Sequence, residues 1–128
     1  MTKRVLCVDD NEDTCLMLRL LLKLAGYQVA TAGTVADGLN LARNQDFDLY
    51  LLDSRLPDGS GLQFCQEIRS LDRHTPIIFC SGSAALEDQQ EAIGAGANAY
   101  LTKPVEPDDL KETIHSLLHK ASHAGQSA

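Results

Sequence analysis

Basic side chains are scarce in this sequence. Among its 128 residues, Lys and Arg together number 11, Asp and Glu together number 18, and the formal net charge is −7. A chain with this balance repels the phosphates of DNA and RNA, so direct nucleic-acid binding is not an expected role. The surplus of carboxylates favours a protein that binds cations.

Long apolar runs are lacking as well. No stretch approaches the roughly 20 apolar residues that span a bilayer. The N-terminal residues lead into a short apolar stretch without the layout of a signal peptide. We therefore expect a cytoplasmic protein that has no membrane partner.

Paired cysteine motifs are absent. None of the four cysteines belongs to a C-x-x-C pair, which argues against a zinc site. A disulfide framework is not expected in a cytosolic domain with this much apolar residue. Cys7 and Cys80 lie inside apolar runs, so we predict that both are small core residues.

The hydrophobic pattern alternates between strand and helix five times. The predicted strands cover residues 4–8, 27–32, 49–52, 77–80 and 99–101. Helices are predicted at 11–25, from 34, between a turn-rich loop at 56–61 and about residue 71, at about 86–93, and from 107. Such alternation predicts a parallel sheet with helices on both faces.

The character of the strands predicts their order. The first, third and fourth strands are apolar throughout, as central strands buried on both faces should be. The second alternates and the fifth is short, so both are placed at edges. We predict an α/β fold, a single flavodoxin-like, doubly wound, five-stranded parallel sheet of order 2-1-3-4-5 with five helices. Residues 1–121 would form this domain, and 122–128 a short flexible tail.

Polar residues follow the strands at their carboxyl ends. Asp9 and Asp10 follow the first strand, Asp53 the third, Ser81 the fourth and Lys103 the fifth. Sheets of this kind bind ligands at this edge, where the strand order switches between the first and third strands. Because neighbouring strands lie about 4.8 Å apart, the three carboxyl groups must converge and repel one another. Mg²⁺, which favours carboxylate and water oxygens, would remove the conflict.

The same residues can transfer a phosphoryl group. An aspartate held beside Mg²⁺ is a usable nucleophile toward phosphorus. The metal and Lys103 would neutralise charge on the transferring group, and Ser81 can donate a hydrogen bond to its oxygens.

Four segments carry a resemblance to a known family. They are V-D-D-N (8–11), L-L-D-S-R-L-P-D-G-S-G-L (51–62), C-S-G-S (80–83) and A-Y-L-T-K-P (99–104). In these segments and their order, the chain resembles the response regulator receiver family of two-component signalling over nearly its whole length. Each motif alone has an ordinary explanation as a turn or a cap, but the full set at fitting spacing does not.

The resemblance implies a metal site and a phosphorylation site. Asp9, Asp10, Asp53 and the backbone carbonyl of Arg55 would be the ligands of Mg²⁺ or Mn²⁺. Asp53 would accept the phosphoryl group. The chain would be a signalling switch that catalyses only its own phosphorylation and dephosphorylation.

The resemblance also implies how the phosphoryl group is sensed. Ser81 and Lys103 would contact it as catalytic residues, and Ser81 and Tyr100 would act as the switch. Tyr100 has surface packing on an edge strand as its alternative role. The peptide bond between Lys103 and Pro104 would be cis, as in the family.

The implied partners are a sensor histidine kinase or a histidine phosphotransfer protein. A homodimer or an output partner would use the face made by the fourth helix, fifth strand and fifth helix. The chain would be a stand-alone regulator, a receiver cut from a longer regulator, or the receiver end of a hybrid kinase; these alternatives stay open.

Two other classes of protein share part of the pattern. Phosphatases of the haloacid dehalogenase class also combine an Asp nucleophile with Ser or Thr, Lys and Mg²⁺-binding acids. They need a second Asp two residues after the nucleophile, where this chain has Arg55. A flavodoxin-like cofactor binder needs a phosphate-binding loop after the first strand, but Asp9 and Asp10 would repel phosphate unless a cation intervened.

Two positions depart from the commonest family pattern. Ser81 replaces the more frequent Thr and keeps the hydroxyl. Arg55 replaces a usually apolar or small residue, and it would pair with an aspartate or screen the phosphoryl group from water, so the phosphate lifetime stays open.

Two further patterns are interpreted as structural features without a functional role. The histidines at positions 115, 119 and 123 have the i, i+4, i+8 spacing of a metal chelator. We expect this helix end to fray, which argues against a metal site there. The segment 94–97 is rich in glycine and alanine, but it precedes a strand and is interpreted as a turn.

Overall fold

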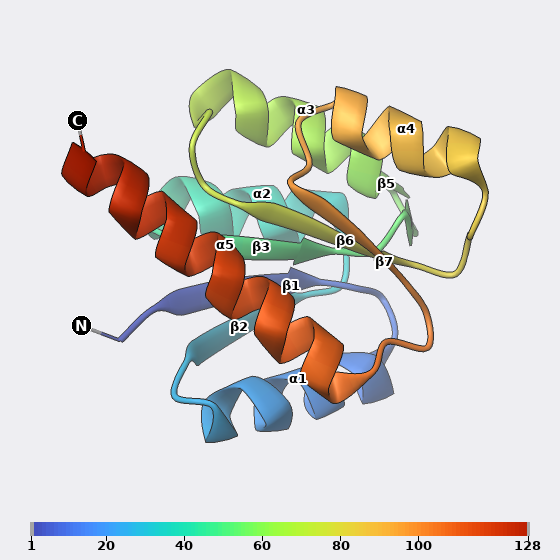
Figure 1. Cartoon of the computed structure of the whole chain (residues 1–128). Coiled ribbons are helices and arrows are strands. Elements are labelled where there is room, and N and C mark those ends of the chain that lie inside the picture. The colour runs from blue at the N-terminus through green and yellow to red at the C-terminus, as the bar shows by residue number, and fades with distance from the viewer. Residues whose placement is uncertain (1, 128) are drawn as a thin grey trace.

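Five parallel strands form one sheet in the order β2-β1-β3-β6-β7 (Figure 1). The structure is a computed structural model that describes residues 2–127, with side chains described in residues 2–119. The strands are β1 (Arg4–Val8), β2 (Gln28–Ala32), β3 (Leu49–Leu52), β6 (Ile77–Ser81) and β7 (Ala99–Thr102). The helices are α1 (Glu12–Leu24), α2 (Val35–Asn44), α3 (Gly61–Leu71), α4 (Leu86–Gly94) and α5 (Pro107–Ser127). The predicted fold class and strand order are confirmed.

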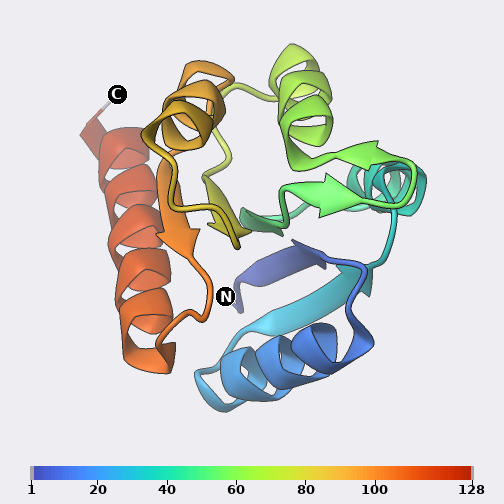
Figure 2. The ribbon, with the colours of Figure 1, turned by 90° about the vertical axis from the view of Figure 1, so that its right-hand side faces the viewer.

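Helices cover both faces of the sheet. In Figures 1 and 2, α1 and α5 lie on one face, and α2, α3 and α4 lie on the other. Alternate residues of β1 enter two separate cores: Leu6 and Val8 contribute to the core beneath α2 and α3, and Val5 and Cys7 to the core beneath α1 and α5. Two-sided burial explains why the central strands are apolar at every position. Cys7 and Cys80 are buried, as predicted.

Polar caps fix where the helices begin. The side chains of Asn11, Thr34 and Ser60 accept hydrogen bonds from backbone N–H groups in the first turns of α1, α2 and α3. Each cap satisfies a donor that the helix itself leaves free. Because Asn11 caps α1 directly after Asp9 and Asp10, the chain turns sharply at the end of β1, and both acids are held in that turn.

The loop predicted at 56–61 contains regular structure. It holds two short antiparallel strands, β4 (Arg55–Leu56) and β5 (Gly59–Ser60). Gly61 follows, and a Cβ atom at this position would lie 2.2 Å from the carbonyl oxygen of Asp53. Glycine is therefore required where α3 starts, because the helix begins in direct contact with the backbone of Asp53.

Helix α4 is weakly anchored. Of its apolar residues, Ala92 is buried, but Leu86 and Ile93 are 66% and 49% exposed. Its N-cap, Ala85, provides no side-chain hydrogen bond. A segment with so few buried contacts opens at a low free-energy cost.

The C-terminal predictions lie mostly outside the described side chains. The boundary at residue 121, the flexible tail at 122–128 and the role of His123 remain predictions. Within residues 2–127, no helix combines the length and apolar character needed to cross a membrane.

Candidate functional site

Three carboxylates meet where the strand order switches between β1 and β3. Val8 and Leu52, the last residues of the two strands, are paired in register. Asp9 and Asp53 directly follow them and therefore lie side by side. One oxygen from each of Asp9, Asp10 and Asp53 lies within 4.8 Å of the others. The structure thus brings together the three acids predicted from the sequence, and their oxygens are the hard donors that Mg²⁺ or Mn²⁺ prefers.

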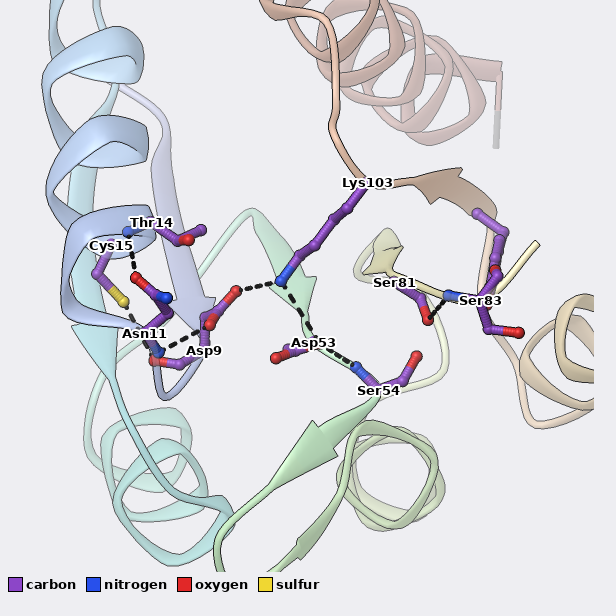
Figure 3. A network of polar contacts seen from close by, with 10 residues as sticks. Asp9, Asn11, Thr14, Cys15, Asp53, Ser54, Ser81, Ser83 and Lys103 are labelled. Atoms are coloured by element: carbon purple, nitrogen blue, oxygen red, sulfur yellow. Dashed lines mark hydrogen bonds and ion pairs between the residues drawn. The ribbon is translucent and has the colours of Figure 1, made fainter.

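Asp9 is the buried member of the cluster. Its side chain accepts one hydrogen bond from the backbone N–H of Asn11 and one from the Lys103 ammonium, each at 2.9 Å (Figure 3). Its backbone carbonyl accepts the thiol of Cys15 at 3.2 Å. A buried charge is tolerated only when it is paired in this way. The role of Asn11 and Cys15 in holding Asp9 was not predicted from the sequence.

Asp53 has a less favourable environment than Asp9. Its carboxylate accepts the N–H of Ser54 at 2.8 Å, while the Lys103 nitrogen lies 3.6 Å away. Burial raises the pKa of Asp53 above its usual value, and the charge of Asp9 raises it further. Lys103 and the backbone N–H groups of Ser54 and Arg55 oppose this shift but do not cancel it. The ionised form of Asp53 is therefore unfavourable in this environment, and a further cation would stabilise it.

Lys103 is the cation that the cluster already holds. Burial by itself would lower its pKa, but the hydrogen bond to Asp9 and the charges of Asp9 and Asp53 outweigh that effect and raise the pKa above the usual value. Lys103 therefore stays charged. Its backbone N–H donates to the Ser81 carbonyl at 2.7 Å, and its peptide bond to Pro104 is cis. The backbone hydrogen bond ties Lys103 to the end of β6.

Ser81 belongs to a hydrogen-bonded chain that leads away from the acids. Its side chain is almost fully buried, and its hydroxyl oxygen accepts the N–H of Ser83 at 3.1 Å. The Ser83 carbonyl accepts the Tyr100 hydroxyl at 2.8 Å, and the Ser83 hydroxyl donates to the Asp88 carboxylate on α4. Tyr100, half-buried, also stacks on Phe79 with ring centroids 6.1 Å apart. Ser83 thus links Ser81 to Tyr100 and to α4.

The sequence had not identified Ser83 as a linking residue. The only available signal was its position two residues after Ser81, at the end of the quoted segment 80–83. Its contacts depend on the approach of β7 and α4, which a local pattern does not reveal.

A cavity of about 770 Å³ joins the acids to α4. Its walls include Asp10, Asp53, Arg55, Ser81, Ser83, Asp88, Glu91, Tyr100 and Lys103. All predicted site residues except Asp9 and Pro104 therefore border one open space. The exposed side chain of Arg55 stands on one wall, and the acids of α4 stand on another.

Comparison with known proteins decides the family. A model of the response regulator receiver domain matches residues 5–115. The chain belongs to the response regulator receiver family. It is thereby a receiver domain of two-component signalling, a family whose general function is to accept a phosphoryl group, and the predicted resemblance is confirmed.

Individual relatives agree with this assignment. The cell cycle response regulator CtrA of Brucella ovis is 35% identical over 124 residues, which cover 97% of this chain and 53% of that protein. A CheY-like receiver domain from Methanospirillum hungatei has a TM-score of 0.93 and 35% identity, covering 97% of this chain and 99% of that one. The chemotaxis response regulator CheY4 of Vibrio cholerae has a TM-score of 0.86 and 31% identity, covering 91% and 99%. The chain spans about half the length of the curated relatives it matches.

In metal-free buffer, Asp53→Asn is expected to stabilise the fold at neutral pH. Because the folded-state pKa of Asp53 is raised, stability is lost as the pH rises from the usual carboxyl pKa of about 3.9 through the folded-state value. Asparagine removes this loss and keeps an oxygen for the Ser54 N–H. Thermal unfolding in EDTA should give a higher Tm at pH 7, with a difference that disappears below about pH 4.

The matched control for this experiment is Asp46→Asn, which changes an exposed loop aspartate. A lower Tm for Asp53→Asn at pH 7, or an equal rise for Asp46→Asn, would contradict the unfavourable ionisation of Asp53.

Proposed function

We propose that Asp53 accepts the phosphoryl group in a Mg²⁺-dependent reaction, and that this modification switches the face formed by α4, β7 and α5. The observation that carries the proposal is the convergence of Asp9, Asp10 and Asp53, one oxygen of each within 4.8 Å of the others. The Lys103 ammonium lies 2.9 Å from Asp9 and 3.6 Å from Asp53. Asp53 is the acid of this cluster that follows a central strand buried at every position.

Asp9, Asp10, Asp53 and the carbonyl of Arg55 would hold the metal. When bound, Mg²⁺ or Mn²⁺ would neutralise the repelling carboxylates and the charge of an incoming phosphoryl group. Three carboxylates of this kind fit an oxygen-preferring cation, and the raised pKa of Asp53, caused by burial and the neighbouring Asp9, supports a need for one.

The residues of the chain would perform the transfer as follows. A carboxylate oxygen of Asp53 attacks the phosphorus atom, and the bond from phosphorus to the donor breaks, so an acyl phosphate forms. Lys103, a charged group 3.6 Å from Asp53, neutralises the phosphoryl oxygens. Ser81 accepts a hydrogen bond from Ser83, which leaves its own hydroxyl proton free to be donated to the phosphoryl group.

We infer that the chain is a switch and not a phosphatase that acts on other substrates. Haloacid dehalogenase phosphatases need an acid two residues after the nucleophile, and the residue here is Arg55. The chain would catalyse only its own phosphorylation and dephosphorylation. Arg55, on the wall of the cavity that contains Asp53, would influence how long the phosphoryl group persists.

Family membership implies a histidine kinase or a phosphotransfer protein as donor. We propose that this partner contacts α1, which begins directly after Asp10 and presents an unusual apolar surface. Leu16, Met17, Leu20 and Leu24 are 55%, 52%, 55% and 88% exposed. Exposed apolar side chains gathered in this way mark a surface that binds another protein. We propose a cytoplasmic location, with no partner among membranes or nucleic acids.

The conformational change would be transmitted through Ser83. When the Ser81 hydroxyl turns toward a phosphoryl group on Asp53, it leaves the N–H of Ser83, and the Ser83 bonds to Tyr100 and Asp88 are disturbed. Tyr100 then has room to turn inward. Because α4 buries little besides Ala92, a small change in free energy is enough to move it. A homodimer or output partner would read this change on the α4–β7–α5 face.

The acceptor assignment predicts labelling at one residue. Acetyl phosphate with Mg²⁺ should add one labile phosphoryl group, detected by intact mass spectrometry and mapped to Asp53. Asp53→Asn should fold and remain unlabelled, because the amide has no nucleophilic oxygen of comparable strength. Asp46→Asn should label as the wild type does. Full labelling of Asp53→Asn would contradict the assignment of Asp53 as the phosphoryl acceptor.

The metal assignment predicts that Asp10 matters more for Mg²⁺ than other exposed acids. Asp10→Ala should weaken Mg²⁺ affinity at least about tenfold, since even partners outside the ligand shell commonly change affinity by that factor. Isothermal titration is the measurement, and Asp13→Ala, an exposed acid in the first turn of α1, is the control. Titrations of Asp10→Ala and wild type that superimpose would refute the role of Asp10.

The switch predicts a localised change in backbone dynamics. On phosphorylation, hydrogen exchange should change most between residues 83 and 103. Ser81→Ala should accept the phosphoryl group yet lose most of that change. Ser70→Ala, which changes an exposed residue of α3, should behave as wild type. A change confined to α1 and α2 would place the switch elsewhere.

A further inference from the structure

Two histidines on α5 lie outside the site described above. His115 and His119 are four residues apart, and both side chains are exposed. Their rings are nearly parallel, with centroids 6.2 Å apart and planes inclined by 16°. Residues at this spacing share one face of a helix, which is the arrangement used when two histidines of a helix bind one zinc ion.

We propose that His115 and His119 form a second cation site, which binds a transition metal such as Zn²⁺, Ni²⁺ or Cu²⁺ through imidazole nitrogens. The chemistry differs from that of the carboxylate cluster. Imidazole suits these metals, whereas Mg²⁺ selects oxygen donors. The proposal rests on residues 115 and 119 alone and is independent of the function proposed for Asp53.

The core fixes the backbone that carries both histidines. Each one follows a buried residue: Ile114 is fully buried and Leu118 is 8% exposed. Both belong to the core shared by α1, α5 and the sheet. The helix also continues beyond His119, to Ser127. His115 and His119 therefore lie within the helix, beside residues that are packed in the core.

The separation of the rings fits a shared metal. A Zn–N bond of about 2.0–2.1 Å places each ring centre about 3.2 Å from the ion, so two rings at a tetrahedral ion lie about 5 Å apart. The observed 6.2 Å is about 1 Å wider. Rotation of two exposed side chains closes that difference without moving the helix. Water would complete the coordination.

The charges around the pair favour a cation. Glu112 is exposed and lies one helical turn before His115, on the same side of α5. Lys120 follows His119 directly and lies outside the described side chains. Among the described side chains, the basic residue nearest in sequence is Lys111, which extends toward Asp108, with its nitrogen 3.8 Å from that carboxylate. The chain as a whole carries a net charge of −7. No described feature of the helix places a positive group between the two imidazoles.

The test is a Zn²⁺ titration by calorimetry at pH 7.5, with saturating Mg²⁺ present to occupy the carboxylates. All proteins carry His123→Ala, so that only the two described histidines of α5 are measured. Two donors on one rigid element gain about a hundredfold in affinity over a single donor, so His115→Ala and His119→Ala should each weaken Zn²⁺ binding by about that factor. His74→Ala, which changes an exposed loop histidine, should bind as the parent does.

A second variant separates spacing from histidine number. His119→Ala combined with Ser116→His keeps two histidines on α5 but places them at i, i+1, where they do not face each other. This double variant should bind Zn²⁺ as weakly as His119→Ala does. Metal-free Tm values establish that each variant is folded. Unchanged Zn²⁺ affinity in both single variants, full affinity in the respaced variant, or loss of binding in His74→Ala would overturn the proposal.

Discussion

Asp9, Asp10 and Asp53 repel one another, and the fold must supply the free energy that holds them together. Three carboxylates with oxygens within 4.8 Å of one another are unfavourable, and one ammonium, that of Lys103, leaves the cluster with two uncompensated negative charges. Burial of β1 and β3 on both faces supplies the opposing free energy and locks the register that brings the acids together. A bound divalent cation would balance the remaining charge, whereas a monovalent cation would not.

The Lys103 ammonium lies closer to Asp9 than to Asp53, and this difference in distance gives the two acids different electrostatic environments. Its nitrogen lies 2.9 Å from Asp9 but 3.6 Å from Asp53. Asp9 is thus held in place, with each of its oxygens accepting one hydrogen bond. Asp53, whose pKa is raised by burial and by Asp9, lies farther from the ammonium. This difference supports the proposal that Asp53, and not Asp9, accepts the phosphoryl group.

Sequence patterns predicted what depends on local periodicity. The apolar runs that became β1, β3 and β6 and the acids that follow them were identified because strand ends in a parallel sheet meet at one edge. The β4–β5 pair was missed, since two-residue strands have no periodicity. The exposure of Leu86 and Ile93 cannot be read from the sequence, because a short helix with few apolar residues does not specify the face that it buries. The linking role of Ser83 depends on contacts between distant segments.

The position of Ser83 supports the proposed route from Asp53 to α4. The bond from Ser83 N–H to Ser81 joins neutral groups, and such bonds contribute about 1 kcal/mol net. A bond from the Ser81 hydroxyl to an anionic phosphoryl oxygen would be roughly twice as strong. The modified state therefore favours the displaced hydroxyl by a free energy comparable to a single hydrogen bond. That bias is small, but α4 is held by little more than Ala92 and the Ser83–Asp88 contact, so a small bias is sufficient to shift its equilibrium.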